Sequence, residues 1–122
     1  MERVRALEHN YTNHISVVND VCSFEKELRE AAKSQAAEGA VLSNVVAVLA
    51  DEMGLSPDAS KAVLWSMCRD WERQHEQMVS EIIRDECSDG LKAYMHGLEL
   101  QMSGNELWSR TTPRYNQLER AE

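Results

Sequence analysis

Three oxygen-bearing side chains recur at four-residue steps in the first quarter of the chain: Asn19, Ser23 and Glu27. If this segment is helical, each step turns about 40° around the axis, so the three fan over about 80° of one face and span about 12 Å. Because side chains lean toward the start of a helix, Glu27 should reach back toward Ser23. An amide, a hydroxyl and a single carboxylate favour Mg²⁺ over Zn²⁺ or a calcium-binding loop.

A magnesium site with only one carboxylate predicts an anionic ligand, since Mg²⁺ is often held by one or two carboxylates together with phosphate oxygens. Lys26 lies about 20° from Asn19 around the same helix, where its ammonium group could meet that anion. Spacing alone also fits an ordinary polar helix face. Asparagine and serine are mediocre helix formers, however, so their place in mid-helix calls for a reason.

The hydrophobic pattern predicts an all-α chain, with apolar residues recurring at three- and four-residue steps. Pro57 after Ser56 is a strong helix start, and Gly54 and Ser88 are predicted helix boundaries. The expected helices run from about Leu7 to Ala32, from about Ala40 to Met53, from Ser56 to about Asp85 and from about Leu91 to Met102. The tail from Ser109 is expected to be irregular.

Each expected helix has one apolar stripe that should face a core. The residues expected to face inward are Tyr11, Ile15, Val18, Cys22, Leu42, Val45, Val46, Leu49, Leu64, Met67, Cys68, Trp71, His75, Met78, Val79, Ile82, Leu91, Tyr94, Met95, Leu98 and Met102. Gly90, Gly97 and Gly104 recur every seven residues, which indicates either simple tolerance or the close approach of another backbone or a ligand. The four helices fit a small bundle or a piece of a larger helical domain.

Composition restricts the classes of function. The chain has 122 residues, enough for one domain with a core. Its net charge of −8 argues against a nucleic-acid partner or an anionic membrane. The longest apolar run, Val45 to Ala50, is too short to span a bilayer, and no signal peptide is evident, so a cytoplasmic protein is expected.

The cysteines and histidines are scattered along the chain. None has the close spacing of a zinc site, and the odd number of cysteines argues against a disulfide framework. We expect reduced, mostly buried thiols and structural histidines. The residues concerned are Cys22, Cys68, Cys87, His9, His14, His75 and His96.

The residues around the predicted cation site resemble a metal motif of class I terpene synthases. Asn19-Asp20-x-x-Ser23-x-x-Lys26-Glu27 resembles (N/D)D-x-x-(S/T)-x-x-(K/R)-E, and Val18 to Arg29 is most similar to fungal sesquiterpene cyclases of the aristolochene synthase type. A second match resembles the C-terminal signature of fungal and bacterial members: Gly104-Asn105-x-x-Trp108-Ser109-x-x-x-x-Arg114-Tyr115. Leu64-Trp65-Ser66-Met67 and Trp71-Glu72 also resemble the fungal group.

This resemblance implies a fold and a set of roles. The fold would be the C-terminal helices of a class I terpenoid synthase bundle, and the activity a Mg²⁺-dependent cyclisation of a prenyl diphosphate, most simply farnesyl diphosphate. Asn19, Ser23 and Glu27 would bind one Mg²⁺ of three, whereas Asp20 belongs to the motif without being a ligand. The residues implied to bind the diphosphate are Lys26, Arg114 and Tyr115. Trp108 would line the cavity and stabilise the carbocation with its π face.

The resemblance covers nearly all of residues 1–122 but only about the last third of the family's domain. The family's aspartate-rich motif and its upstream diphosphate-sensing arginine have no counterpart here; the D-E-x-x-D spelling from Asp85 to Asp89 comes after the metal motif and is interpreted as a helix end followed by a cap. The isolated chain is therefore expected to be inactive alone. The family's fungal members also suggest a homodimer.

Two other hypotheses remain open at this point. One is a non-catalytic helical interaction module, or degenerate cyclase remnant, that binds a partner helix through its apolar stripes. The other is an acidic four-helix bundle unrelated to terpene synthases, which would ignore Mg²⁺ and diphosphate.

Overall fold

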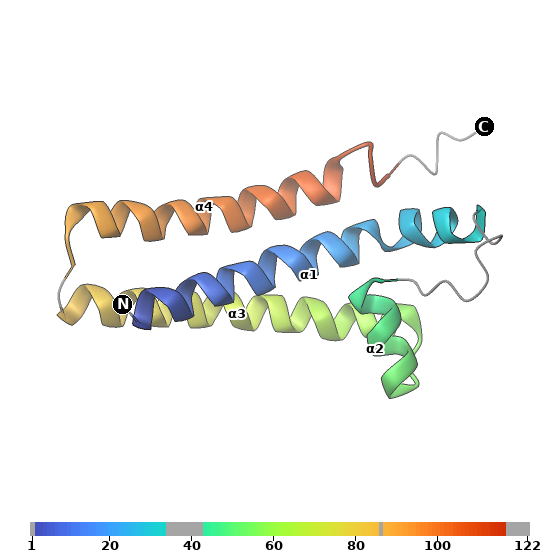
Figure 1. The fold of residues 1–122 in the computed structure, drawn as a ribbon, viewed down its shortest axis with the longest axis horizontal. Helices are drawn as coiled ribbons and strands as arrows, with labels where there is room; N and C mark the ends of the chain where they lie inside the picture. The colour runs from blue at the N-terminus through green and yellow to red at the C-terminus, as the bar shows by residue number, and fades with distance from the viewer. Residues whose placement is uncertain (1, 34–42, 86, 117–122) are drawn as a thin grey trace.

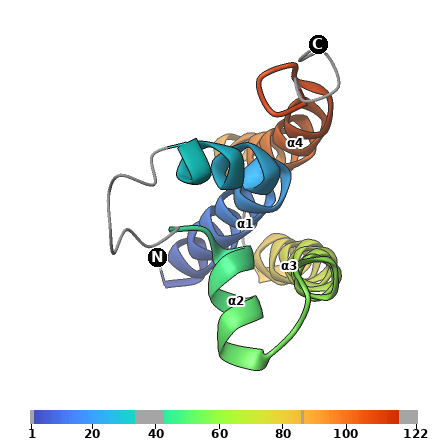
Figure 2. The same ribbon diagram turned by 90° about the vertical axis from the view of Figure 1, so that its right-hand side faces the viewer.

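The computed structural model describes residues 2–33, 43–85 and 87–116, and within these ranges the chain forms helices and no strand. The helices are α1 (Glu2–Lys33), α2 (Val45–Met53), α3 (Pro57–Asp85) and α4 (Asp89–Thr111). The prediction of an all-α chain is confirmed. α1 runs between α3 and α4, and the short α2 lies beside α1 and α3 at one end (Figures 1 and 2). None of the described helices is both long and apolar enough to cross a membrane.

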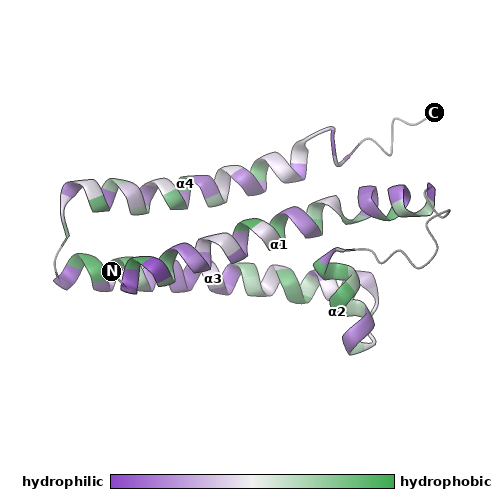
Figure 3. Cartoon of the chain, viewed as in Figure 1, coloured by the Kyte–Doolittle hydropathy of each residue, from purple (hydrophilic) through white to green (hydrophobic). Residues whose placement is uncertain are grey.

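α1 is held by two apolar clusters at different heights along its length. The first joins α1, α3 and α4 through Leu7, Ile82, Met95 and Leu98. The second joins α1, α2 and α3 through Val21, Phe24, Val46 and Leu64. α2 is coloured as largely hydrophobic up to its acidic end (Figure 3). Buried polar side chains separate the two clusters on α1, where the Asn10 amide donates to the Trp71 carbonyl over 2.8 Å.

The predicted helix boundaries at Gly54, Ser56 and Ser88 are confirmed. Gly54 adopts φ 65°, a left-handed conformation that suits glycine, and closes α2. The Ser56 hydroxyl accepts the Ala59 N–H at 3.0 Å, and the Ser88 hydroxyl accepts the Leu91 N–H at 3.1 Å. Asp85 ends α3 and Asp89 begins α4, as the interpretation of this stretch expected, while Glu86 lies outside the described residues.

Three helix bounds differ from the prediction. α1 begins at Glu2 rather than near Leu7, and α2 begins at Val45 because Asn44 caps it; Ala40 and Leu42 lie outside the described residues. The prediction that α4 ends at Met102 is wrong. The expected irregular tail begins after Thr111 rather than at Ser109, and the described residues 112–116 are non-helical. α4 continues to Thr111, since contacts with the rest of the structure hold its last turns.

Some burial predictions are also corrected. Met67 and Tyr94 were expected to face the core but are 42% and 43% exposed. Among the described residues, a Cβ added to Gly97 or Gly104 would meet no atom within 4 Å, so no other part of this chain approaches either glycine closely.

The thiols and imidazoles divide into buried and exposed groups. Cys68 is buried, but Cys22 and Cys87 are only half-buried, so the expectation of mostly buried thiols holds for one of them. His14 and His75 are buried, whereas His9 and His96 are exposed.

Candidate functional site

The predicted reach of Glu27 back toward Ser23 is confirmed. On α1 the Ser23 hydroxyl donates to Glu27 Oε2 over 2.6 Å, and Ser23 is 4% exposed. The four-residue spacing of a helix brings the two side chains together on one face. A hydroxyl oxygen and a carboxylate thus converge at one point of the helix.

A residue outside the motif holds the second carboxylate oxygen of Glu27. The Asn44 amide nitrogen lies 3.2 Å from Glu27 Oε1 and 2.9 Å from the carbonyl oxygen of Asp20. Asn44 Oδ1 accepts the Val46 N–H at 2.8 Å and thereby caps α2. Asn44 was not predicted from the sequence, although an asparagine directly before an apolar run is a recognisable helix-cap signal.

Asp20 faces α2 and supports its N-terminus. Its Oδ2 accepts the Val45 N–H at 2.9 Å, which satisfies a second free donor of that helix. Burial raises the pKa of Asp20; the Val45 N–H opposes the rise, and the nearby charge of Glu27 adds to it. This motif carboxylate is therefore engaged in joining α2 to α1.

Asn19 meets α4. The Ser109 hydroxyl, which is 1% exposed, donates to Asn19 Oδ1 over 3.3 Å. The first motif position is thus in contact with the C-terminal motif, which places the two sequence matches on adjoining helices.

The donor set fits a hard divalent cation. Asn19, Ser23 and Glu27 offer an amide, a hydroxyl and a carboxylate oxygen from one helix, and Mg²⁺ prefers oxygen ligands of this kind. Their hydrogen bonds leave coordinating capacity: a hydroxyl that donates keeps two lone pairs, and a carboxylate has about four lone-pair sites, of which two are used here. These residues could therefore hold a metal without losing their partners.

The other predicted site residues make separate local contacts. The Lys26 ammonium group is 2.7 Å from Glu30 Oε2 on the same helix. Arg114 lies in a turn after α4, where its backbone N–H donates to Thr112 Oγ1 over 3.2 Å and its side chain is exposed. Trp108 and Tyr115 contact each other edge to face, with ring centroids 5.6 Å apart.

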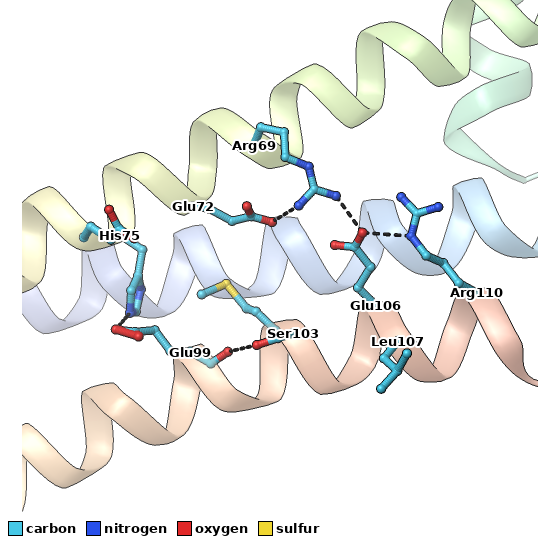
Figure 4. A pocket seen from close by; sticks show the side chains of 10 residues that line it. Arg69, Glu72, His75, Glu99, Ser103, Glu106, Leu107 and Arg110 are labelled. Carbon is cyan, nitrogen blue, oxygen red and sulfur yellow. Dashed lines mark hydrogen bonds and ion pairs between the residues drawn. The ribbon is translucent and has the colours of Figure 1, made fainter.

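A groove of about 430 Å³ lies between α3 and α4, and its charged side chains were not predicted (Figure 4). Arg69 bridges two helices: its guanidinium is 2.7 Å from Glu72 Oε2 and 2.6 Å from Glu106 Oε2. Arg110 reaches the same Glu106 oxygen at 2.9 Å. The pairs within one helix follow from spacing of three and four residues, but the bond from Arg69 to Glu106 depends on how the helices pack.

The ion pairs of Arg69 and Arg110 with Glu106 favour the ionised form of that carboxylate. Burial works to raise the pKa of Glu106, but the hydrogen bonds from Arg69 and Arg110 outweigh it and hold that pKa below its usual value. Arg110 also lies over the ring of Trp65, 4.1 Å from its centroid. The ion pair between Arg69 and Glu106 and the packing of Arg110 on Trp65 therefore hold the last turns of α4 against α3. Ser109, which contacts Asn19, lies in these turns.

His14, Glu72 and Glu106 offer possible metal-ligating atoms that lie within 4.8 Å of one another. The buried His14 ring is already 2.8 Å from Glu72, and the Arg69 guanidinium bonds to both carboxylates. Since Arg69 supplies the positive charge that a metal would supply, we interpret this group as a structural ion-pair network.

Comparisons with known proteins identify the family of the chain. Residues 1–74 match the family described as terpene synthase family 2, C-terminal metal binding. The aristolochene synthase of Penicillium roqueforti is 52% identical over 118 residues, which cover 95% of this chain and 34% of that protein. That of Aspergillus terreus is 46% identical over 117 residues, covering 95% of this chain and 36% of its own length.

A solved structure is also similar. The crystal structure of aristolochene synthase from Penicillium roqueforti superimposes with a TM-score of 0.76 at 48% identity, over 91% of this chain and 35% of that one. The chain thus spans about a third of the length of the relatives it matches. On the family match, the sequence identity and the superposition together, the chain belongs to the metal-binding terpene synthase family 2.

Proposed function

We propose that this chain is the C-terminal portion, residues 1–122, of the catalytic domain of a Mg²⁺-dependent sesquiterpene cyclase that acts on farnesyl diphosphate. The observation that carries the proposal is the 2.6 Å contact between Ser23 and Glu27, which brings a hydroxyl and a carboxylate oxygen together in a chain of a metal-binding terpene synthase family. The similarity to aristolochene synthases supports the substrate class and the reaction.

The proposed reaction begins when the carbon–oxygen bond to the diphosphate breaks and leaves an allylic cation. Bound Mg²⁺ would supply positive charge to the departing diphosphate. Asn19, Ser23 and Glu27 hold that ion in the proposal. Because the chain carries a net charge of −8, local positive charge has to bind the anion.

Lys26, Arg114 and Tyr115 bind the diphosphate in this proposal. Arg114 is exposed and so accessible to an anion, and its guanidinium can donate to two phosphate oxygens at once. Lys26 would exchange its exposed pairing with Glu30 for the diphosphate, which costs little because surface ion pairs are weak. Tyr115 can donate one hydrogen bond.

Trp108 is proposed to stabilise the cation with its π face, a contact worth about 2 kcal/mol or more when water is excluded. Its side chain is 48% exposed among the described residues, so part of the indole is accessible to a neighbour. Tyr115 contacts the indole in an edge-to-face arrangement.

The proposal assigns the remaining catalytic parts to sequence upstream of the matched segment, where the family resemblance locates the aspartate-rich motif. The chain spans 34% of the Penicillium roqueforti enzyme. We therefore expect the 122 residues alone to make no sesquiterpene from farnesyl diphosphate and Mg²⁺.

A chimera tests the proposal. The matching segment of the Penicillium roqueforti aristolochene synthase is replaced by this chain, and hydrocarbon products are analysed after incubation with farnesyl diphosphate and Mg²⁺. We expect a defined sesquiterpene. Glu27→Gln should abolish most of the activity because it removes a charged ligand, while Asp20→Asn should cost less because Asp20 serves the α2 terminus.

Two results would contradict the proposal. One is a chimera that melts cooperatively near the parent temperature yet makes no product, which would favour a non-catalytic helical module. The other is an equal or larger loss for Asp20→Asn than for Glu27→Gln, which would reject the assigned ligand set.

A further inference from the structure

We propose that Asn44 is a positioning residue for the metal ligand Glu27. This inference rests on the proposed function, because it requires Glu27 to bind the metal. Asn44 lies 17 residues beyond Glu27 and outside the metal motif, directly before α2.

The contacts of Asn44 determine which way its amide faces. Its Oδ1 accepts the backbone N–H of Val46 at 2.8 Å, and a backbone N–H can only donate. The amide nitrogen therefore faces the opposite side, where its two N–H groups meet two acceptors. These are Glu27 Oε1 at 3.2 Å and the Asp20 carbonyl at 2.9 Å.

Burial makes these contacts hard to replace. Asn44 is 1% exposed, so water cannot readily take over a lost hydrogen bond. Every donor and acceptor group of the amide has a partner, which fixes the side chain in one orientation.

The consequence for Glu27 is that both of its carboxylate oxygens are held. Ser23 binds Oε2 from one side and Asn44 binds Oε1 from the other. A carboxylate held in this way loses little conformational freedom when a metal binds, and outer-sphere hydrogen bonds of this kind raise metal affinity. If Asn44 loses its donor, only Ser23 orients the carboxylate.

The cap and the positioning contact can be separated by mutation. Asn44→Ser keeps a good helix-capping oxygen but lacks the N–H group that reaches Glu27. Asn44→Ala removes both. In either variant the bond from Val45 to Asp20 and the burial of Val46 still dock α2. Ser88→Ala is the matched control, because it removes the cap of α4, which is distant in sequence from the motif.

The contact itself is tested without metal. The side-chain amide resonance of Asn44 is the NH₂ pair that disappears from the nitrogen–proton NMR spectrum of Asn44→Ser. We expect Glu27→Ala to shift this resonance strongly. Glu30→Ala, which removes the same charge from the same helix, should leave it in place.

The role is tested with Mn²⁺ as a paramagnetic probe of the magnesium site, since both ions accept oxygen ligands. With inorganic diphosphate present as the anion, broadening of Ser23 and Glu27 resonances in the 122-residue chain gives a site-specific affinity. We expect both Asn44→Ser and Asn44→Ala to weaken this affinity by about tenfold. Melting temperature should fall for Asn44→Ala and for Ser88→Ala, with Mn²⁺ affinity unchanged in the latter.

The outcomes distinguish the two proposals. Wild-type affinity in Asn44→Ser, or affinity that follows melting temperature across all three variants, overturns the positioning role and leaves the metal site standing. An Asn44 amide resonance that ignores Glu27→Ala also overturns it. A wild-type chain without broadening at Ser23 and Glu27, although inorganic diphosphate is present, overturns the proposed function, and the positioning role with it.

Discussion

Ser109 on α4 donates a 3.3 Å hydrogen bond to Asn19 Oδ1 on α1, and this contact joins two motifs that lie 90 residues apart. Ser109 is 1% exposed, and the network of Arg69, Glu106 and Arg110 fastens the same turns of α4 to α3. The C-terminal motif on α4 therefore helps to orient Asn19, the first residue of the metal motif.

Removing this hydrogen bond should weaken metal binding. Ser109→Ala is nearly isosteric but leaves Asn19 Oδ1 without its donor. A neutral hydrogen bond contributes about 1 kcal/mol, so Mn²⁺ affinity at Ser23 and Glu27 should fall about fivefold. Ser103→Ala is the control, because Ser103 is exposed and its hydroxyl donates to the Glu99 carbonyl of its own helix. Equal Mn²⁺ affinities in Ser109→Ala and Ser103→Ala would show that metal binding does not depend on the hydrogen bond from Ser109 to Asn19.

Local patterns of the sequence were sufficient for most of the fold. Apolar periodicity predicted α1 and α3, and cap residues predicted the boundaries at Gly54, Ser56 and Ser88. The last turns of α4 were missed because Gly104 and polar neighbours weaken the local signal. Those turns are stabilised by contacts with α1 and α3, which no local pattern contains.

In the candidate site, too, local spacing predicted some contacts, whereas others depend on how the helices pack. The convergence of Ser23 and Glu27 follows from helix geometry, so four-residue spacing was enough to predict it. The approach of Asn44 to Glu27 depends on where α2 docks, and that position is set by the packing of Val46 against α1 and α3. A single sequence reveals the cap at Asn44 but not the carboxylate that its amide meets.

His75 should make stability depend on pH. Its side chain is 1% exposed, and burial holds its pKa below the usual 6.5 despite the charge of Glu99 at 3.7 Å. Below pH 6.5 the unfolded chain therefore gains a proton that the folded chain does not, so stability falls on acidification until the folded pKa is reached. The slope cannot exceed about 1.4 kcal/mol per pH unit.

Urea unfolding between pH 7.5 and 5.5 measures this slope. His75→Gln should flatten it, even if the variant is less stable at every pH. His96→Gln, which changes an exposed histidine on α4, is the control and should keep the slope of the wild type. A wild-type slope in His75→Gln would mean that other groups cause the acid sensitivity.

Cys68 should resist alkylation in the folded chain. Burial raises the pKa of its thiol to about 12, and the thiolate is the reactive form. Burial also raises the pKa of Cys22, whose side chain is half-buried. With iodoacetamide at pH 8, peptide mapping should find Cys87 and Cys22 modified long before Cys68. All three should react alike in concentrated guanidinium chloride, and equal rates without denaturant would contradict the packing of α3.

Trp108→Ala in the chimera should change the product and not the diphosphate binding. Its ring is proposed to face the carbocation, whereas its known contact is with Tyr115. We expect a mixture shifted toward less cyclised hydrocarbons, because the cation loses a π partner. The stabilisation given by Mg²⁺ plus inorganic diphosphate should persist. An unchanged product profile would remove Trp108 from the proposed cavity wall.

Arg114→Lys in the chimera should separate ligand binding from folding. The Arg114 side chain is exposed, so melting without ligand should change little. Lysine keeps the charge but cannot donate to two phosphate oxygens in a fixed geometry. Because a ligand stabilises only through contacts with the folded state, the increase in melting temperature given by Mg²⁺ plus diphosphate should shrink.

Tyr115→Phe is the companion variant to Arg114→Lys. It keeps the contact with Trp108 and loses one hydrogen-bond donor, so a smaller reduction of the ligand-induced increase in melting temperature is expected. If Mg²⁺ plus diphosphate raised the melting temperature of both variants as much as that of the parent chimera, the turn after α4 would not contact the diphosphate.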